Sequence, residues 1–257
     1  LKKYKDGTWM ILTFKRKIIL ILFYNMVRRI KILDTTLRDG EQTPNISFNF
    51  NEKLKIMQNL DKLGVDICEL GFPSASKEEY QIISELAKIP TNMELAVLVR
   101  MKKEDIFTAY TCLEKAKNKR IYLFYPCSDI HLKEKVNKTR KEALNIIKNN
   151  IIYARNLFNN IQFSVEDATR TDIDFLVEVY QTAIDSGANI IGIADTLGFT
   201  LPNEYGNIIK KLKKELRYEN VSFSVHCHDD LGLATANTLA GILNGADQIE
   251  VTINGIG

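Results

Sequence analysis

The feature that most constrains this sequence is a regular alternation of short apolar runs with longer amphipathic segments, which begins near Arg29. The short runs are rich in β-branched residues and are typical of strands buried on both faces, as in a parallel sheet. They occupy residues 31–36, 65–72, 93–100, 120–125, 161–167, 189–196, 221–229 and 248–255. The helical segments between them occupy residues 51–64, 77–87, 104–115, 138–158, 172–186, 202–216 and 231–244.

Strand followed by helix, repeated in this way, indicates parallel strands joined by right-handed crossovers. Eight strands predict one (β/α)₈ TIM barrel, with functional residues at the C-terminal ends of the strands. An open, doubly wound sheet is the alternative, but no GxGxxG motif follows any strand. The pattern predicts that the last helix, which would cover the eighth strand, is missing. For the helix at 51–64 we expect Asn51 as N-cap and Gly64 as the C′ residue.

Residues 1–25 do not share the pattern. The first 31 residues hold nine lysines and arginines against one aspartate, so the basic excess lies mostly outside the patterned part, which argues against a nucleic-acid-binding protein. The apolar run at 18–24 is too short to span a bilayer. We therefore predict an atypical extension over 1–25, with a membrane-surface anchor as the alternative, and a barrel domain over 26–257. Four scattered cysteines without a CxxC pair favour reduced thiols in the cytoplasm.

Two of the three histidines, His226 and His228, lie two residues apart on the seventh predicted strand. Residues at this spacing point to the same side of a strand, so both imidazoles can reach one ion. The motif by itself leaves metal ligands and buried structural histidines equally open. Asp39, after the first strand, is the natural third ligand. Mixed carboxylate and imidazole ligation suits Mg²⁺, Mn²⁺ or Zn²⁺ and does not choose among them.

Other polar residues at the predicted strand ends have both a structural and a chemical interpretation. Arg38 could form a simple ion pair with Asp39, or it could be a fixed cation that stabilises an oxyanion on a carbonyl compound. Glu166 could be a solvated carboxylate, or it could support proton transfer. For His131, after the fourth strand, we expect a surface or capping role.

Six segments carry a specific resemblance to one family: LDTTLRDGEQTP (33–44), LGVDICELGFPSAS (63–76), SDIHLKEKVNKTRKEAL (128–144), FSVEDATRTDIDFLVEV (163–179), ADTLGFTLPNEYGNII (194–209) and HCHDDLGLATANTL (226–239). Together they resemble the 2-isopropylmalate synthases, which belong to the wider group of metal-dependent condensing and lyase barrels. The resemblance implies condensation of acetyl-CoA with 2-oxoisovalerate and hydrolysis of the thioester, the first committed step of leucine biosynthesis. It also implies a cytoplasmic acyltransferase that forms a homodimer.

The resemblance also assigns roles to individual residues. It implies that Asp39, His226 and His228 bind the divalent cation, with Mn²⁺ or Mg²⁺ ahead of Zn²⁺. The remaining site residues would be Arg38 (catalytic and substrate-binding), Gln42 and Thr196 (substrate-binding), and Glu166 (catalytic). Glu166 would support the base that takes a proton from the acetyl methyl group.

Departures from the family pattern keep alternatives open. Homocitrate synthases commonly have an arginine four residues before the strand-five glutamate, where this chain has Gln162; homocitrate or citramalate synthase is the alternative activity. Asn45 replaces a usual glycine, and asparagine tolerates left-handed φ. Family members continue beyond NGIG (254–257) into a further metal-binding asparagine, catalytic residues and a regulatory domain. A second hypothesis is therefore an inactive fragment that binds only metal and oxoacid, with little turnover.

Overall fold

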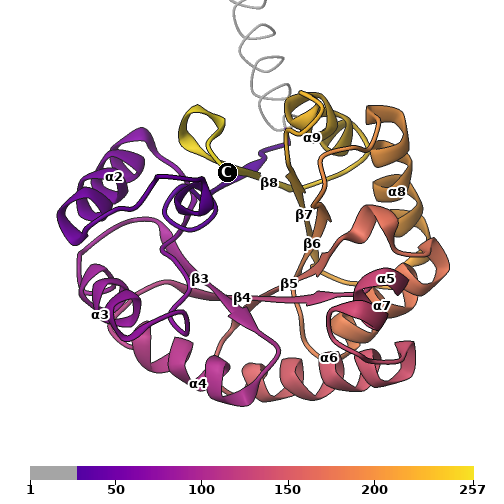
Figure 1. The fold of residues 1–257 in the computed structure, drawn as a ribbon, viewed down its shortest axis with the longest axis horizontal. Helices are drawn as coiled ribbons and strands as arrows, with labels where there is room; N and C mark the ends of the chain where they lie inside the picture. Colours follow the sequence, from indigo (N-terminus) through magenta and orange to yellow (C-terminus); the bar gives the residue numbers. More distant parts are fainter. Residues whose placement is uncertain (1–27) are drawn as a thin grey trace, which may run out of the picture. The chain divides into compact units, whose positions relative to one another are not determined.

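A closed barrel of eight parallel strands forms the centre of the computed structural model (Figure 1). The strands are β1 (Lys31–Asp34), β2 (Ile67–Glu69), β3 (Glu94–Arg100), β4 (Lys119–Pro126), β5 (Asn160–Glu166), β6 (Ile190–Asp195), β7 (Ser222–Cys227) and β8 (Gln248–Val251). Each strand pairs with the next in sequence, and β1 closes the barrel on β8. The TIM barrel is thereby confirmed, and the open doubly wound sheet is excluded.

Helices surround the barrel and connect successive strands (Figure 1). They are α2 (Phe50–Leu63), α3 (Lys77–Leu86), α4 (Lys103–Cys112), α5 (Asp129–Glu134), α6 (Arg140–Arg155), α7 (Ile173–Asp185), α8 (Pro202–Glu215) and α9 (Ala234–Leu243), with 3-10 turns η1 (Gly40–Gln42), η2 (Ala168–Arg170) and η3 (Ile253–Gly255). All seven predicted helices are present, whereas α5 was not predicted. After β8 the described chain contains η3 and no α-helix.

The structure describes residues 28–257. The predicted extension over 1–25, and the first two residues of the predicted barrel domain, lie outside the described residues. Residues 31–257 form one compact unit. Within the described part, no helix is both long and apolar enough to cross a membrane.

Local backbone features correct two sequence predictions and confirm two others. The N-cap of α2 is Asn49 rather than Asn51, because Asn49 has an extended backbone and exchanges capping-box hydrogen bonds with Glu52. Gly64 ends the helix in the left-handed region, at φ 82°, as predicted. Asn45 also adopts left-handed φ, at 66°. The eighth strand ends at Val251 instead of residue 255, since the chain turns into η3 there.

The buried core has two compartments. The larger one fills the space between barrel and helices. Inside the barrel, a small apolar cluster is formed by Leu33, Ile67, Ala96 and Tyr122, from β1 to β4. The barrel interior also holds five polar side chains that are fully or nearly buried: Arg120, Gln162, Ser224, Gln248 and Glu250. Polar groups at this depth need hydrogen-bond partners, and the partners extend up to the C-terminal rim.

Candidate metal centre

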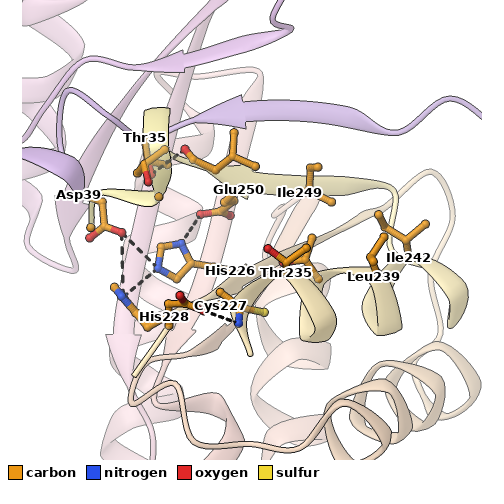
Figure 2. Close-up of a pocket in the computed structure, with 17 residues that line it drawn as sticks. Thr35, Asp39, His226, Cys227, His228, Thr235, Leu239, Ile242, Ile249 and Glu250 are labelled. Carbon is orange, nitrogen blue, oxygen red and sulfur yellow. Dashed lines mark hydrogen bonds and ion pairs between the residues drawn. The ribbon is translucent and has the colours of Figure 1, made fainter. Parts of the chain in front are cut away.

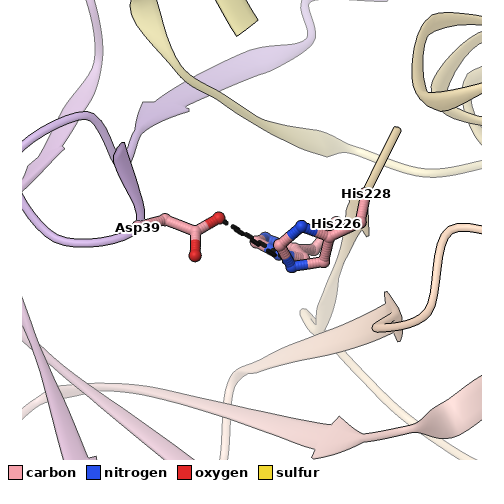
Figure 3. A group of neighbouring side chains, drawn as sticks. All are labelled: Asp39, His226 and His228. Carbon is pink, nitrogen blue, oxygen red and sulfur yellow. Dashed lines mark hydrogen bonds and ion pairs between the residues drawn. The ribbon is translucent and has the colours of Figure 1, made fainter. Parts of the chain in front are cut away.

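Three of the predicted site residues meet at the C-terminal rim of the barrel: Asp39, His226 and His228 (Figure 3). Asp39 precedes η1, just after β1, while His226 is on β7 and His228 follows its last residue. One ligand atom from each lies within 4.8 Å of the others. The two Nε2 atoms are 3.1 Å apart, and Asp39 Oδ2 lies 3.6 Å from the Nε2 atom of His226 and 4.0 Å from that of His228. This spacing places three donor atoms around one point.

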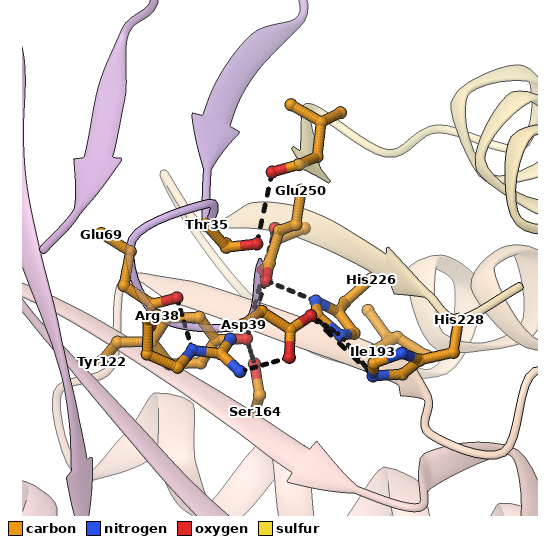
Figure 4. A network of polar contacts seen from close by, with 12 residues as sticks. Thr35, Arg38, Asp39, Glu69, Tyr122, Ser164, Ile193, His226, His228 and Glu250 are labelled. Carbon is orange, nitrogen blue, oxygen red and sulfur yellow. Dashed lines mark hydrogen bonds and ion pairs between the residues drawn. The ribbon is translucent and has the colours of Figure 1, made fainter. Parts of the chain in front are cut away.

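The ligand atoms fit a divalent cation by their chemistry as well as their positions. His226 Nδ1 lies 3.0 Å from Glu250 Oε2, on the side of the ring away from Asp39 (Figure 4). A carboxylate that accepts a hydrogen bond from Nδ1–H leaves the Nε2 lone pair free for a metal ion, an arrangement common among metal-binding histidines. One carboxylate and two imidazoles suit Mn²⁺, Mg²⁺ or Zn²⁺.

Burial and charge oppose each other in this group. Burial raises the pKa of the Asp39 carboxyl, but the charges of Arg38, His226 and His228 outweigh it and lower that pKa. Burial lowers the pKa of the His226 imidazole, but its hydrogen bond with Glu250 and the charge of Asp39 outweigh it, so the pKa is raised. Burial, together with the charge of His226, lowers the pKa of His228. An ionised Asp39 at neutral pH makes the point between the three side chains attractive to a cation.

Arg38 is held rigidly beside the ligand group. Its Nε donates to Glu69 Oε2 at 2.7 Å, and its Nη1 donates to Asp39 Oδ1 at 2.8 Å (Figure 4). Burial raises the pKa of Glu69 to about 7, with Arg38 opposing the rise. The predicted Arg38–Asp39 ion pair is therefore present. It uses one of five guanidinium N–H groups, and Glu69 accepts from another, so an ion pair does not prevent Arg38 from acting on a third group.

Glu166, Thr196 and Gln42 lie on the same rim but outside the ligand group. Glu166, the last residue of β5, pairs with Lys135 at 2.5 Å and lies 3.4 Å from His131 Nδ1. Thr196 Oγ1 accepts the Asp167 N–H at 2.8 Å, which leaves its own O–H proton available to another acceptor. Gln42 is exposed at the end of η1.

His131 does not have the simple surface or capping position that the sequence indicates. It lies in α5 with a side chain that is 23% exposed, facing Glu166 and Asp167. Its Nδ1 atom is buried without a hydrogen bond in good geometry. The capping residue of this helix is Ser128, whose hydroxyl accepts the His131 N–H. The contacts of His131 with Glu166 and Asp167 were not predicted from the sequence, because they depend on how α5 packs against the end of β5.

Glu250 was likewise not predicted as a site residue from the sequence. Asn254 lies within the predicted eighth strand at 248–255, but in the structure it lies beyond β8, in η3. Gln248 and Glu250 have the i, i+2 spacing of residues that face the same side of a strand. Two polar residues at that spacing in an apolar strand were the available signal.

A cavity of about 380 Å³ borders the ligand group (Figure 2). Asp39, His226 and His228 form part of its wall. Apolar side chains of α9 and β8 form another part, among them Leu239, Ile242 and Ile249. The volume is within the range of small-molecule sites, and apolar walls with a few converging polar groups are typical of them.

The loop that carries Asp39 is anchored by a buried lysine. Lys53 of α2 is completely buried, and its Nζ lies 2.7 Å from Glu41 Oε2 and 2.9 Å from both oxygens of Glu79. Glu41 in turn accepts the Phe48 N–H at 2.8 Å. The ion cluster therefore ties the β1–α2 loop to α2 and α3, two residues beyond Asp39.

Comparison with known proteins adds a family and a set of relatives. The family model described as HMGL-like matches residues 29–257. The chain is 47% identical to a 2-isopropylmalate synthase from Streptococcus gallolyticus and 48% identical to one from Staphylococcus carnosus, covering 90% and 89% of this chain and 45% of each relative. A 2-isopropylmalate synthase 1 from Caldanaerobacter subterraneus is 47% identical, covering 90% of this chain and 58% of the relative. The chain thus spans about half the length of these curated relatives.

Solved structures with the same fold include HMG-CoA lyases. One from Pseudomonas aeruginosa superposes with a TM-score of 0.75 at 19% identity, covering 90% of this chain and 78% of that one. Another, from Acinetobacter baumannii in complex with coenzyme A and 3-methylmalate, has a TM-score of 0.74 at 17% identity, covering 89% and 76%. At this level of identity the likeness concerns the fold.

Proposed function

The chain belongs to the HMGL-like family, and from this premise we propose that it forms the catalytic barrel of a 2-isopropylmalate synthase. The reaction would join the methyl carbon of acetyl-CoA to the ketone carbon of 2-oxoisovalerate, after which water cleaves the thioester and releases CoA. Sequence identities of 47–48% to 2-isopropylmalate synthases support this activity. The observation that carries the proposal is the convergence of Asp39, His226 and His228 beside Arg38.

Asp39, His226 and His228 would hold a divalent cation, Mn²⁺ or Mg²⁺ in preference to Zn²⁺. When bound, such a cation supplies Lewis-acid polarisation of a carbonyl and orients the oxoacid. The carboxylate of Asp39 contributes the negative charge of the ligand set. Glu250 orients the imidazole of His226.

Arg38 would stabilise the negative charge that develops on the ketone oxygen of the oxoacid. A preorganised cation contributes most when it does not have to reorient during the reaction. The hydrogen bonds from Arg38 to Glu69 and Asp39 fix the guanidinium in this way. Glu69 is thus a positioning residue for Arg38.

Thr196 and Gln42 would bind the oxoacid, and Glu166 would support proton removal. The Thr196 hydroxyl already accepts one hydrogen bond, so its proton can be donated to the oxoacid carboxylate. Glu166 would assist the base that takes a proton from the acetyl methyl group, and that electron pair then forms the new carbon–carbon bond. Its contacts with Lys135 and His131 hold it at the rim.

We propose 2-oxoisovalerate rather than a dicarboxylic oxoacid as the substrate. At the position where homocitrate synthases commonly have an arginine, Gln162 is fully buried and hydrogen-bonded to Glu250 inside the barrel. A neutral buried amide offers no cation for a second carboxylate. The proposal also includes acetyl-CoA as co-substrate, a cytoplasmic homodimer, and no nucleic-acid or membrane partner.

An assay of CoA release on the complete gene product tests this function. With acetyl-CoA and Mn²⁺, we expect the highest kcat/KM for 2-oxoisovalerate, and loss of activity after chelation that Mn²⁺ restores. A higher kcat/KM for 2-oxoglutarate or pyruvate would instead identify a homocitrate or citramalate synthase. Metal binding without CoA release from any of the three would contradict the proposed enzyme.

A further inference from the structure

Buried polar side chains inside the barrel form a continuous chain of hydrogen bonds that ends at His226. We propose that this interior polar network, comprising Arg120, Gln162, Gln248, Ser224 and Glu250, sets the tautomer of His226 so that its Nε2 lone pair faces Asp39 and His228. The inference rests on the proposed function in assigning His226 as a metal ligand. It adds positioning residues that act on this ligand from inside the barrel.

Arg120 fixes which groups of the network donate and which accept, because a guanidinium can only donate. Its Nη1 atom lies 2.9 Å from Gln162 Oε1 and 2.8 Å from Gln248 Oε1. Both amides must therefore turn their oxygens toward Arg120 and their NH₂ groups away from it. Arg120 is 1% exposed, and its Nη2 donates to Glu94 Oε2 at 2.6 Å, which holds the guanidinium in place.

The NH₂ groups of the two amides point toward Glu250, Gln162 donating to it directly and Gln248 through Ser224. Gln162 Nε2 donates to Glu250 Oε1 at 2.7 Å. Gln248 Nε2 donates to Ser224 Oγ at 2.8 Å, so the Ser224 proton is directed to Glu250 Oε1, at 2.7 Å. Every neighbour on this side of Glu250 is a donor.

The other oxygen of Glu250 faces His226. Burial raises the pKa of the Glu250 carboxyl, but the hydrogen bonds from His226 and Ser224 are among the effects that outweigh burial and lower it. The geometry requires an acceptor at Oε2, 3.0 Å from His226 Nδ1, so the Nδ1 atom carries the proton. The Nε2 atom, 3.6 Å from Asp39 Oδ2, is then unprotonated in the neutral ring.

Strand register explains why these residues meet. Ser224 of β7 is the parallel partner of Gln248 of β8, and Val225 is the partner of Ile249. The next step along both strands brings His226 beside Glu250. Ser224 and His226 point to the same side of β7, as Gln248 and Glu250 do on β8, so two inward pairs are stacked beneath the rim.

A Glu250→Gln variant separates this role from general stabilisation. The donors of Gln162 and Ser224 would hold the amide oxygen of the new side chain, which turns its NH₂ group toward His226 Nδ1. Two donors cannot face each other, so the imidazole should become the Nε2–H tautomer and lose the lone pair that faces Asp39. Loss of such an orienting partner typically weakens metal binding about 10- to 100-fold.

The test combines imidazole ¹⁵N chemical shifts of the metal-free chain, read where the rings are neutral, with titration of Mn²⁺. The sequence has only three histidines, so their signals can be assigned by single substitutions. We expect wild-type His226 as the Nδ1–H tautomer, and Glu250→Gln as the Nε2–H tautomer with Mn²⁺ affinity reduced at least tenfold. Ser224→Ala removes one donor to Glu250 and should weaken Mn²⁺ binding less than Glu250→Gln does.

Tyr180→Phe is the matched control, because Tyr180 is fully buried but bonds to the Gly192 carbonyl outside the network. It should keep the wild-type tautomer and affinity. A wild-type Nε2–H tautomer, or Glu250→Gln and Ser224→Ala variants that both bind Mn²⁺ within twofold of wild type, would overturn the inference. The tautomer is read without metal. A wild-type chain that shows Nδ1–H but binds no Mn²⁺ would therefore support the inference while contradicting the proposed metal function.

Discussion

Replacing Lys53 by methionine should strongly destabilise the barrel and disturb the loop that carries Asp39. Lys53 is completely buried and is the cation that lies between Glu41 and Glu79. Methionine preserves most of the volume and removes the charge. Two carboxylates would then face each other without a cation between them.

The magnitude follows from the burial of the three groups. Breaking a buried ion pair by removing one partner typically costs about 3–5 kcal/mol, because the remaining charge is left without compensation. The carboxylates here retain some contact with water, since the side chains of Glu41 and Glu79 are 22% and 17% exposed. We therefore expect a loss near the lower end of that range, about 3 kcal/mol in the free energy of unfolding. For a domain of this size that corresponds to a fall in Tm of about 6–12 °C.

Urea denaturation and thermal unfolding measure the loss, with Lys55→Met as the matched control. Lys55 lies on the same helix but is exposed, so its replacement should change stability by no more than about 0.5 kcal/mol. Adding Glu79→Gln to Lys53→Met should restore part of the stability, because one of the two unpaired charges is removed. A Lys53→Met variant within 1 kcal/mol of wild type would refute this reasoning.

Two other predictions concern the rim. Gly198 has φ +57°, and a Cβ there would lie 2.5 Å from Asp230 Oδ2 and 2.8 Å from the His228 carbonyl oxygen. Gly198→Ala should therefore lower the free energy of unfolding by about 2–3 kcal/mol. Gly64→Ala is the control and should cost about 1 kcal/mol, because Gly64 has φ +82° but open space around it. Similar urea midpoints for the two variants would contradict this prediction. Asp39→Asn should weaken Mn²⁺ binding more than Glu250→Gln does, whereas His131→Gln should leave Mn²⁺ binding unchanged. Calorimetric titration of the three variants with Mn²⁺ checks this order of affinities.

Much of the candidate site could be predicted from the sequence, because the apolar runs show where the strands end. Asp39, His226 and His228 follow or occupy apolar runs, and the C-terminal ends of parallel strands in a barrel lie on one rim. Grouping these three residues therefore required only the fold class. The structure brings their ligand atoms within 4.8 Å of one another.

The partners of these residues could not be found in the same way. Arg38 is separated from Glu69 by 31 positions, and Gln162 from Glu250 by 88, so no local pattern relates them. Glu166 has the predicted place at the end of β5, but its contacts with Lys135 and His131 depend on α5, a short helix without a clear periodic pattern.

The sequence by itself determined the number of strands, seven of the eight described α-helices, their order, the barrel and the rim on which the polar residues gather. These follow from the period of the apolar residues, which is a local property of the chain. Only the tertiary structure decided which buried polar groups pair inside the barrel. Side-chain pairing there depends on the register between neighbouring strands, and a shift of one residue would turn Glu250 away from His226. That register is decided by packing around the whole barrel, so the pairing of Glu250 with His226 can be identified only in the closed barrel.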